Sequence, residues 1–150
     1  MEIWISVSSI AISFIALLLG IYNWRKSLVK LRADIFIHPL NGECWAIEIM
    51  LSNDSSRPVS ILNSKVVVAK TELNQVECRP TRAGFHVYMF NGANVGQTNN
   101  PTTFPFQIAA YGARNMEMVL SQQPDVAQCK IHIQTPGKLF KFKVNAIKEG

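Results

Sequence analysis

The chain has 150 residues and a formal net charge of +5, which is the size of one ordinary domain or of a smaller domain with an appendage. The charge is uneven: residues 25–32 hold four Lys or Arg and no acid, whereas residues 33–150 hold eleven Lys or Arg against nine Asp or Glu, a net +2. A domain at +2 makes no case for a polyanion-binding surface, so we expect no long nucleic acid as a partner.

The first predicted element is a membrane-spanning helix. From Ile3 to Trp24 the chain runs 22 residues without a charge, and such a helix is about 33 Å long, against a hydrocarbon core of roughly 30 Å. A buried core helix rarely runs so far without a polar face. A signal peptide needs a basic start and a small-residue cleavage site, which this sequence does not show. We expect residues 1–32 to form a transmembrane helix with a helical basic extension, followed by a domain over 33–150.

The basic residues after the span predict its orientation. They lie on one side only, before the first acid of the domain: Arg25, Lys26, Lys30 and Arg32. The positive-inside rule places the N-terminus outside and the domain in the cytosol, at the inner (cytoplasmic) membrane, with these side chains at anionic headgroups. An odd set of cysteines, Cys44, Cys78 and Cys129, fits a reducing compartment. The sequon Asn53-Asp54-Ser55 is then without consequence.

A stripe of small and polar residues runs along the predicted span. Its members are spaced alternately three and four residues apart: Ser6, Ser9, Ser13, Ala16, Gly20, Asn23 and Ser27. This heptad spacing puts them on one face, where small side chains let helix backbones approach, so the stripe predicts a homo-oligomer. The alternative is chance, since Ser and Ala are common in single spans. In four or more copies the same polar groups could line a lumen.

After residue 33 the pattern alternates with period two, as in half-buried strands. The predicted strands are 33–38, 44–51, 59–62, 65–70, 76–79, 85–90, 103–111, 116–120, 129–134 and 140–145. The last two form the clearest hairpin, and Pro136-Gly137 between them suits a type II turn. These strands predict an all-β antiparallel sandwich or barrel, immunoglobulin-like in the broad sense.

The candidate ligand surface combines an arginine turn with a polar loop. The stretch Asn91–Asn100 is polar or small throughout and predicts a long exposed loop. Arginines close to a hydroxyl can bind a phosphate or carboxylate, and amides can bind bases or sugars. The predicted ligand-binding residues are Arg79, Thr81, Arg82, Asn91, Asn94, Asn99 and Asn100. The alternative is that the two arginines are simply solvated in a connection.

Catalytic and metal-binding motifs do not appear in the sequence. His38, His86 and His132 lie in or beside alternating runs, where half-exposed histidines are routine. No Cys or His pair has metal-ligand spacing, and no nucleophile elbow, phosphate loop or zinc-protease motif occurs. We therefore expect neither catalysis nor a cofactor.

The layout resembles the small membrane effectors of bacterial antiphage systems. The features shared are a lone N-terminal span, a basic juxtamembrane segment and a small β domain without catalytic residues. These effectors include CRISPR-associated proteins gated by cyclic oligoadenylate. The resemblance implies that the β domain binds a small anionic signal, such as a cyclic oligonucleotide, and that the helices then perturb the membrane. The alternative is a membrane-tethered scaffold or assembly subunit that docks a protein partner, including a phage or plasmid structural membrane protein.

Overall fold

The computed structural model describes the backbone of residues 2–41, 43–144 and 146–147, and the side chains of residues 7–25, 28–41 and 43–144. Within these residues a single helix, α1 (Glu2–Ser27), precedes a domain made only of strands. The strands are β1 (Leu31–Pro39), β2 (Trp45–Asn53), β3 (Val59–Ile61), β4 (Asn63–Val68), β5 (Thr71–Glu72), β6 (Glu77–Pro80), β7 (His86–Phe90), β8 (Ala93–Thr98), β9 (Phe106–Ile108), β10 (Ala113–Leu120), β11 (Cys129–Gln134), β12 (Leu139–Lys143) and β13 (Ala146–Ile147).

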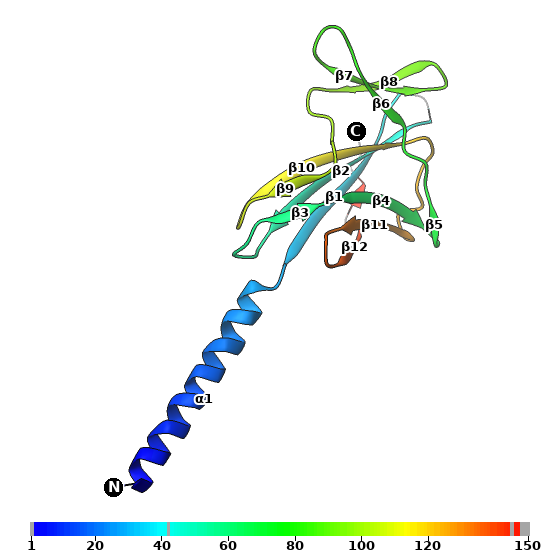
Figure 1. Ribbon diagram of the computed structural model, residues 1–150. Helices are drawn as coiled ribbons and strands as arrows, with labels where there is room; N and C mark the ends of the chain where they lie inside the picture. Colours follow the sequence, from blue (N-terminus) through cyan, green and yellow to red (C-terminus); the bar gives the residue numbers. More distant parts are fainter. Residues whose placement is uncertain (1, 42, 145, 148–150) are drawn as a thin grey trace.

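Helix α1 stands away from the domain (Figure 1), and its stretch Val7–Arg25 is long and apolar enough to cross a membrane. None of that stretch is buried, so α1 is not the core helix of the domain. The predicted helical extension through Arg32 is wrong. The helix ends at Ser27 and β1 begins at Leu31, because the period-two alternation of β1 reaches back to Leu31, which pairs with Asn53.

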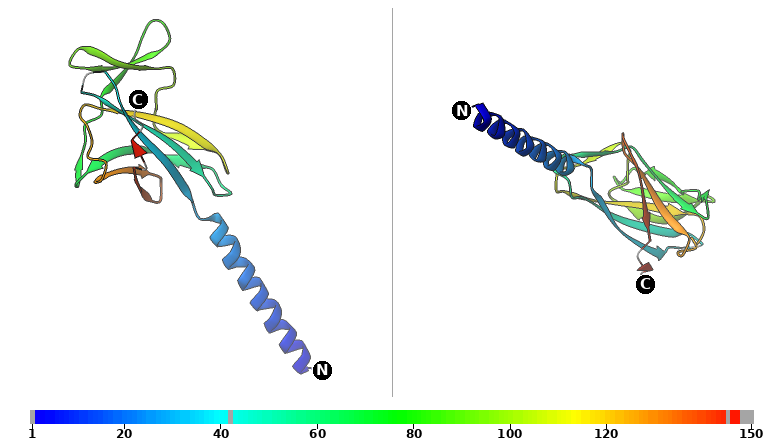
Figure 2. Two further views of the ribbon diagram at one scale, coloured as in Figure 1. Left: turned by 180° about the vertical axis from the view of Figure 1, so that it is seen from behind. Right: turned by 90° about the horizontal axis from the view of Figure 1, so that it is seen from below.

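Two four-stranded sheets face each other and enclose the main core (Figures 1 and 2). One sheet has the order β10-β2-β1-β13, the other β12-β11-β4-β5, and β3 pairs with β9 beside them. The largest fully buried side chains of this core are Ile35, Ile37, Ile47, Ile49, Leu51, Ile61, Ile108, Leu120, Ile131, Ile133 and Val66. The predicted N-terminal helix followed by an antiparallel β sandwich is confirmed, and the sheets do not close into a barrel.

The pairing of β1, β2 and β10 determines what the outer face of the first sheet carries. Ile35 pairs with Ile49, and Ile49 pairs with Met116, so these side chains point into the core. Because successive residues alternate in direction, the neighbouring positions point outward. Phe36 pairs with Glu48, and Glu48 pairs with Glu117, which brings an aromatic ring and two carboxylates to that outer face.

A third sheet, β6-β7-β8, packs over part of the same outer face. A second, smaller apolar cluster lies beneath it, formed by Cys44, Ala46, Val76, Tyr88, Val95 and Val119. The prediction that Asn91–Asn100 forms a long loop is wrong, because β8 occupies most of it and pairs with β7. Asn91 and Gly92 both have positive φ, 49° and 78°, as the two-residue type I′ hairpin turn requires.

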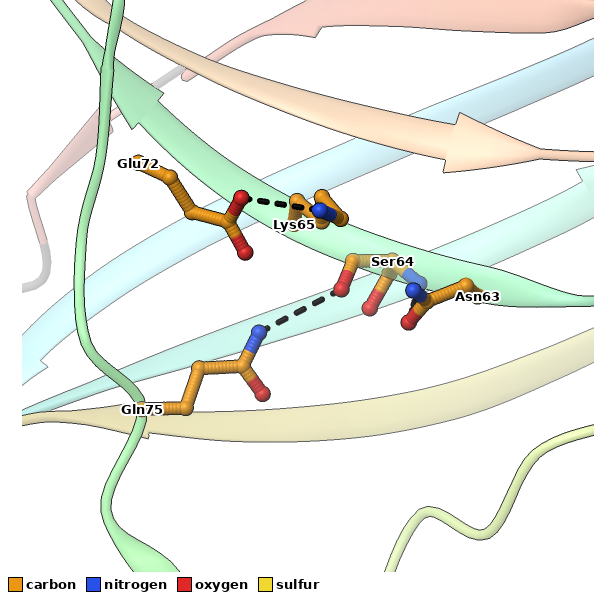
Figure 3. Close-up of polar contacts among 5 residues, drawn as sticks. All are labelled: Asn63, Ser64, Lys65, Glu72 and Gln75. Atoms are coloured by element: carbon orange, nitrogen blue, oxygen red, sulfur yellow. Dashed lines mark hydrogen bonds and ion pairs between the residues drawn. The ribbon is translucent and has the colours of Figure 1, made fainter.

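Two side-chain contacts hold β5 and the chain that follows it against β4 (Figure 3). Lys65 on β4 pairs with Glu72 on β5 at 2.8 Å, and the Gln75 amide donates to the Ser64 carbonyl at 3.3 Å. These contacts hold the chain after β5 against β4 as it crosses toward β6, so the third sheet is joined to the sandwich by an ordered segment.

The predicted C-terminal hairpin is confirmed, with Ile131 opposite Phe142 and Ile133 opposite Phe140. Its predicted type II turn is wrong, because Gly137 does not have the positive φ that this turn needs. The strand expected over 103–111 is shorter, from Phe106 to Ile108. Strand β13 was not predicted, and it pairs in parallel with β1.

Candidate ligand-binding site

The structure divides the predicted ligand residues between two ends of the third sheet. Pro80 pairs with His86, and His86 pairs with Thr98, so Arg79, Thr81 and Arg82 share one end with Asn99 and Asn100. The Asn91 turn and Asn94 lie at the opposite end. At about 3.3 Å per residue, the four steps from His86 to Phe90 separate these ends by about 13 Å. The seven predicted residues therefore do not form one site.

Several of the predicted side chains already form hydrogen bonds within the domain. The Arg79 guanidinium donates to the Glu77 carboxylate at 2.7 Å, and this bond lowers the pKa of Glu77. The Thr81 hydroxyl donates to the Phe85 carbonyl at 2.7 Å and closes the β6–β7 turn. The Asn94 side chain accepts the Gly96 N–H at 3.1 Å. The Arg82 side chain is exposed.

The structure shows a cleft of about 1060 Å³ near the first of these two ends. It lies against the outer face of the β10-β2-β1 sheet, between that face and the segment that connects β8 to β9. Its floor includes Phe36, Glu48 and Glu117, and His86 and Thr98 contribute from the third sheet. Asn100, also in the lining, is the member of the predicted set that the cleft contains.

Two carboxylates lie side by side on the floor of the cleft. Glu48 and Glu117 are direct cross-strand neighbours, and the His38 Nδ1 lies 3.9 Å from the Glu48 Oε1. Burial, and then repulsion from Glu48, raise the pKa of Glu117, while His38 opposes this shift. Glu117 therefore binds a proton more readily than an isolated glutamate, and the two carboxylates favour a ligand group that donates hydrogen bonds or carries positive charge.

His86 lines the same cleft from β7. Its Nδ1 is buried and has no hydrogen-bond partner within the part of the chain that the structure describes. Buried polar atoms in folded proteins nearly always have a partner, so an orphaned ring nitrogen is costly. Because the nitrogen itself is closed to solvent, a ligand in the cleft would supply the missing bond only after the imidazole ring turns toward the cleft. The strand position of His86 was predicted correctly, but its place in this cleft was not.

The wall of the cleft is fixed by one threonine. The Thr102 hydroxyl accepts the Glu117 N–H at 3.0 Å and donates to the Glu117 carbonyl at 3.3 Å. Both bonds fasten the β8–β9 connection to β10. Arg114, also in the lining, lies 4.3 Å over the Phe106 ring, so its cation is stacked on an aromatic side chain.

On the helix, the described members of the small-residue stripe are exposed. The Ser13 hydroxyl donates to the Ser9 carbonyl at 2.9 Å, and a Cβ at Gly20 would meet nothing within 4 Å, so that position is open to a neighbouring helix. The side chains of Ser6, Ser27 and Lys26 lie outside the described residues. Arg25, Lys30 and Arg32 are exposed, and Arg32 pairs with Asp54 at 3.4 Å.

Within the described residues, no group of three His, Cys, Asp or Glu side chains is placed to hold a metal ion. The three cysteines are unpaired, and burial raises the pKa of the Cys129 thiol to about 11. A comparison with protein-family models and with curated proteins found no match to this chain. The function is therefore inferred from the helix, the cleft and their connection.

Proposed function

We propose that this chain is a non-catalytic, single-pass membrane protein whose β domain binds a small ligand in the cleft and passes the binding event to the helix. The observation that carries the proposal is the cleft itself. It combines a carboxylate pair at Glu48 and Glu117 with the unpartnered ring nitrogen of His86. Convergent polar groups with perturbed proton affinity in a concave site are typical of ligand binding.

The connection between cleft and helix supports the second part of the proposal. Phe36 on β1 lines the cleft, and β1 follows α1 after only residues 28–30. The Asp54 N–H donates to the Lys30 carbonyl at 2.8 Å, so this linker is bonded to the domain instead of hanging free. A ligand that displaces β1 would therefore displace the end of the helix.

Self-association of the helices would turn that displacement into a change in the membrane. The open surface at Gly20 and the exposed stripe support close packing between copies. The basic side chains after the helix support a cytosolic domain and an inner-membrane location. The unpaired cysteines fit that placement, and a glycan could not be accommodated at Asn53, whose side chain is 1 % exposed.

The resemblance to antiphage effectors makes cyclic oligonucleotides the first ligands to test. Phosphates would be repelled by the Glu48–Glu117 pair, so in this proposal they stay at the rim of the cleft, near Arg82 and Asn99. The bases, which carry hydrogen-bond donors, would then reach the carboxylates and His86. Antiviral defence is the biological setting that this ligand implies.

The test is calorimetry of the full chain in detergent with a panel of cyclic di- and oligonucleotides. His86→Phe keeps a ring but removes the nitrogen, and loss of one hydrogen bond of about 0.5–1.5 kcal/mol predicts up to about a tenfold weaker affinity. Arg82→Ala tests the rim, and Lys130→Gln, an exposed strand residue outside the cleft lining, is the matched control. Absence of binding by the whole panel would contradict a nucleotide ligand. Equal affinity in the His86 variant would contradict the cleft as the site.

A further inference from the structure

The end of the domain from which the helix leaves is built from two loops and the linker. We call this end the base: the linker residues 28–30, the loop 54–58 and the loop 109–112. Figures 1 and 2 show both loops beside the point where α1 joins β1.

Asn53 holds the two loops of the base together. Its side-chain amide donates to the carbonyls of Arg57 and Ala109, at 2.8 and 3.0 Å, and its backbone N–H donates to the Gly112 carbonyl at 2.8 Å. The Tyr111 N–H also donates to the Ser55 carbonyl at 3.2 Å. The base is therefore a fixed surface and not a pair of independent loops.

The base exposes apolar groups. Tyr111 is 72 % exposed, and it is held outward although its φ of 54° is one that side-chain-bearing residues rarely adopt. Leu28 and Val29 in the linker are 44 % and 36 % exposed. Exposed apolar side chains gathered at one place mark an interaction surface.

The charges around these apolar groups are mostly positive. Arg25, Lys30 and Arg57 are exposed, and Arg32 is balanced by its pair with Asp54. A tyrosine and aliphatic side chains surrounded by basic ones are typical of surfaces that lie in the headgroup region of a bilayer. The linker is three residues long, so it can hold the base no more than about 10 Å from the end of the helix.

We propose that the base docks on the anionic headgroups of the same membrane that α1 crosses, with Tyr111, Leu28 and Val29 in the interface and Arg57 against lipid phosphates. The proposal rests on α1 being a membrane anchor. Docking fixes the orientation of the β domain, so the β6-β7-β8 sheet lies on the side away from the lipid.

The experiment places an environment-sensitive dye on either end of the domain in the full chain. Ala109→Cys labels the base and Ala83→Cys, in the β6–β7 turn at the far end, is the matched control, since both side chains are exposed. Both are made in a Cys78→Ala background, because Cys44 and Cys129 are buried. The labelled proteins are reconstituted in vesicles of phosphatidylcholine alone or with phosphatidylglycerol, and quenching by nitroxide-labelled lipid is measured.

We expect strong quenching at position 109 and little at 83, with more at 109 in anionic vesicles. Arg57→Gln removes roughly one cation from the membrane surface, so the ratio of docked to undocked base should fall about fivefold. Half of the quenching should then be lost at a lower salt concentration than in the wild type. Lys130→Gln, which removes the same charge on β11, should change neither. Equal quenching at 109 and 83 would overturn the proposal. A second result would also overturn it: a dye at position 109 that nitroxide-labelled lipid does not quench, but that quenches itself as the protein-to-lipid ratio rises. That result would assign the base to contact with a second copy of the chain.

A separate readout identifies failure of the anchor. If alkaline carbonate removes the unlabelled chain from vesicles, α1 does not span the bilayer and the proposed function fails together with docking. If the chain resists carbonate but position 109 is not quenched, the anchor stands and only docking is wrong.

Discussion

Replacement of Asn53 by alanine is predicted to destabilise the β domain more than any exposed substitution. The Asn53 side chain is buried and bonds with the carbonyls of Arg57 and Ala109 and with the N–H and hydroxyl of Ser55. In the variant, the Ser55 hydroxyl no longer donates to Asn53 and can donate to the Arg57 carbonyl, which lies 3.1 Å away. The Ala109 carbonyl loses its bond to the amide, and the Ser55 N–H loses its acceptor.

The expected loss of unfolding free energy is roughly 2–3 kcal/mol. The Ser55 N–H is left buried without a partner, which costs about 1–3 kcal/mol, and the Ala109 carbonyl, which keeps the Gly112 N–H, loses one bond worth about 0.5–1.5 kcal/mol. For a domain of this size that corresponds to a fall in Tm of roughly 8–12 °C. Asn63→Ala is the control, since the Asn63 side chain is exposed and accepts one bond, from the Ser64 N–H at 2.8 Å. Water can replace that bond, so its cost should be under about 1 kcal/mol.

The assay is thermal unfolding of the full chain in detergent, followed by near-ultraviolet circular dichroism so that the helix does not contribute a transition. A second readout is hydrogen exchange at Tyr111 and Gly112, whose N–H groups donate to the Ser55 and Ala109 carbonyls. Exchange there should accelerate in Asn53→Ala and not in Asn63→Ala. Equal Tm values for the two variants would refute the assignment of Asn53 as the residue that holds the base together.

Three further tests, two of them with a control substitution, address other elements. Gly92→Ala should cost about 1–2 kcal/mol of stability because its φ is +78°, whereas Gly137→Ala, with open space and no positive φ, should cost under about 0.5 kcal/mol by urea titration. Glu117→Gln should add about 0.2–1 kcal/mol at pH 7–8 by removing like-charge repulsion. Since the folded state raises the pKa of Glu117, wild-type stability falls as pH rises from 4.5 through that higher value, and the variant should lose this decline. Gly20→Leu should reduce oligomer content in detergent and Phe14→Leu should not; equal content would remove the argument for the stripe.

The sequence predicted the elements that have strong local patterns. The unbroken apolar run of α1 and the alternation of β11 with β12 required no knowledge of the rest of the chain. Strand β8 was missed because five of its six residues are polar or small, and Val95 alone is buried. The Asn91-Gly92 pair was the available signal, since this dipeptide is the strongest short-range indication of a hairpin.

The cleft could not be predicted because its residues come together only in the tertiary structure. Glu48 and Glu117 are neighbours through strand pairing, and His86 reaches them from a different sheet. One clue was present in the sequence, because Glu48 interrupts an apolar stretch whose flanking residues, Ile47 and Ile49, are buried. The arginine turn failed as a single site for a related reason: Glu77, two residues before Arg79, already provides its partner.

The short linker sets a steric limit on how copies of this chain can assemble. Two helices in contact along their length hold their axes about 8–10 Å apart, whereas a four-stranded sheet is about 19 Å across. The domain lies on the continuation of the helix axis (Figures 1 and 2), and the three-residue linker 28–30 is bonded to the domain through the Lys30 carbonyl. Neighbouring domains would overlap unless the helices diverge toward them. A pair that packs at Gly20 must therefore cross there at an angle, so that the two helices diverge toward the domains.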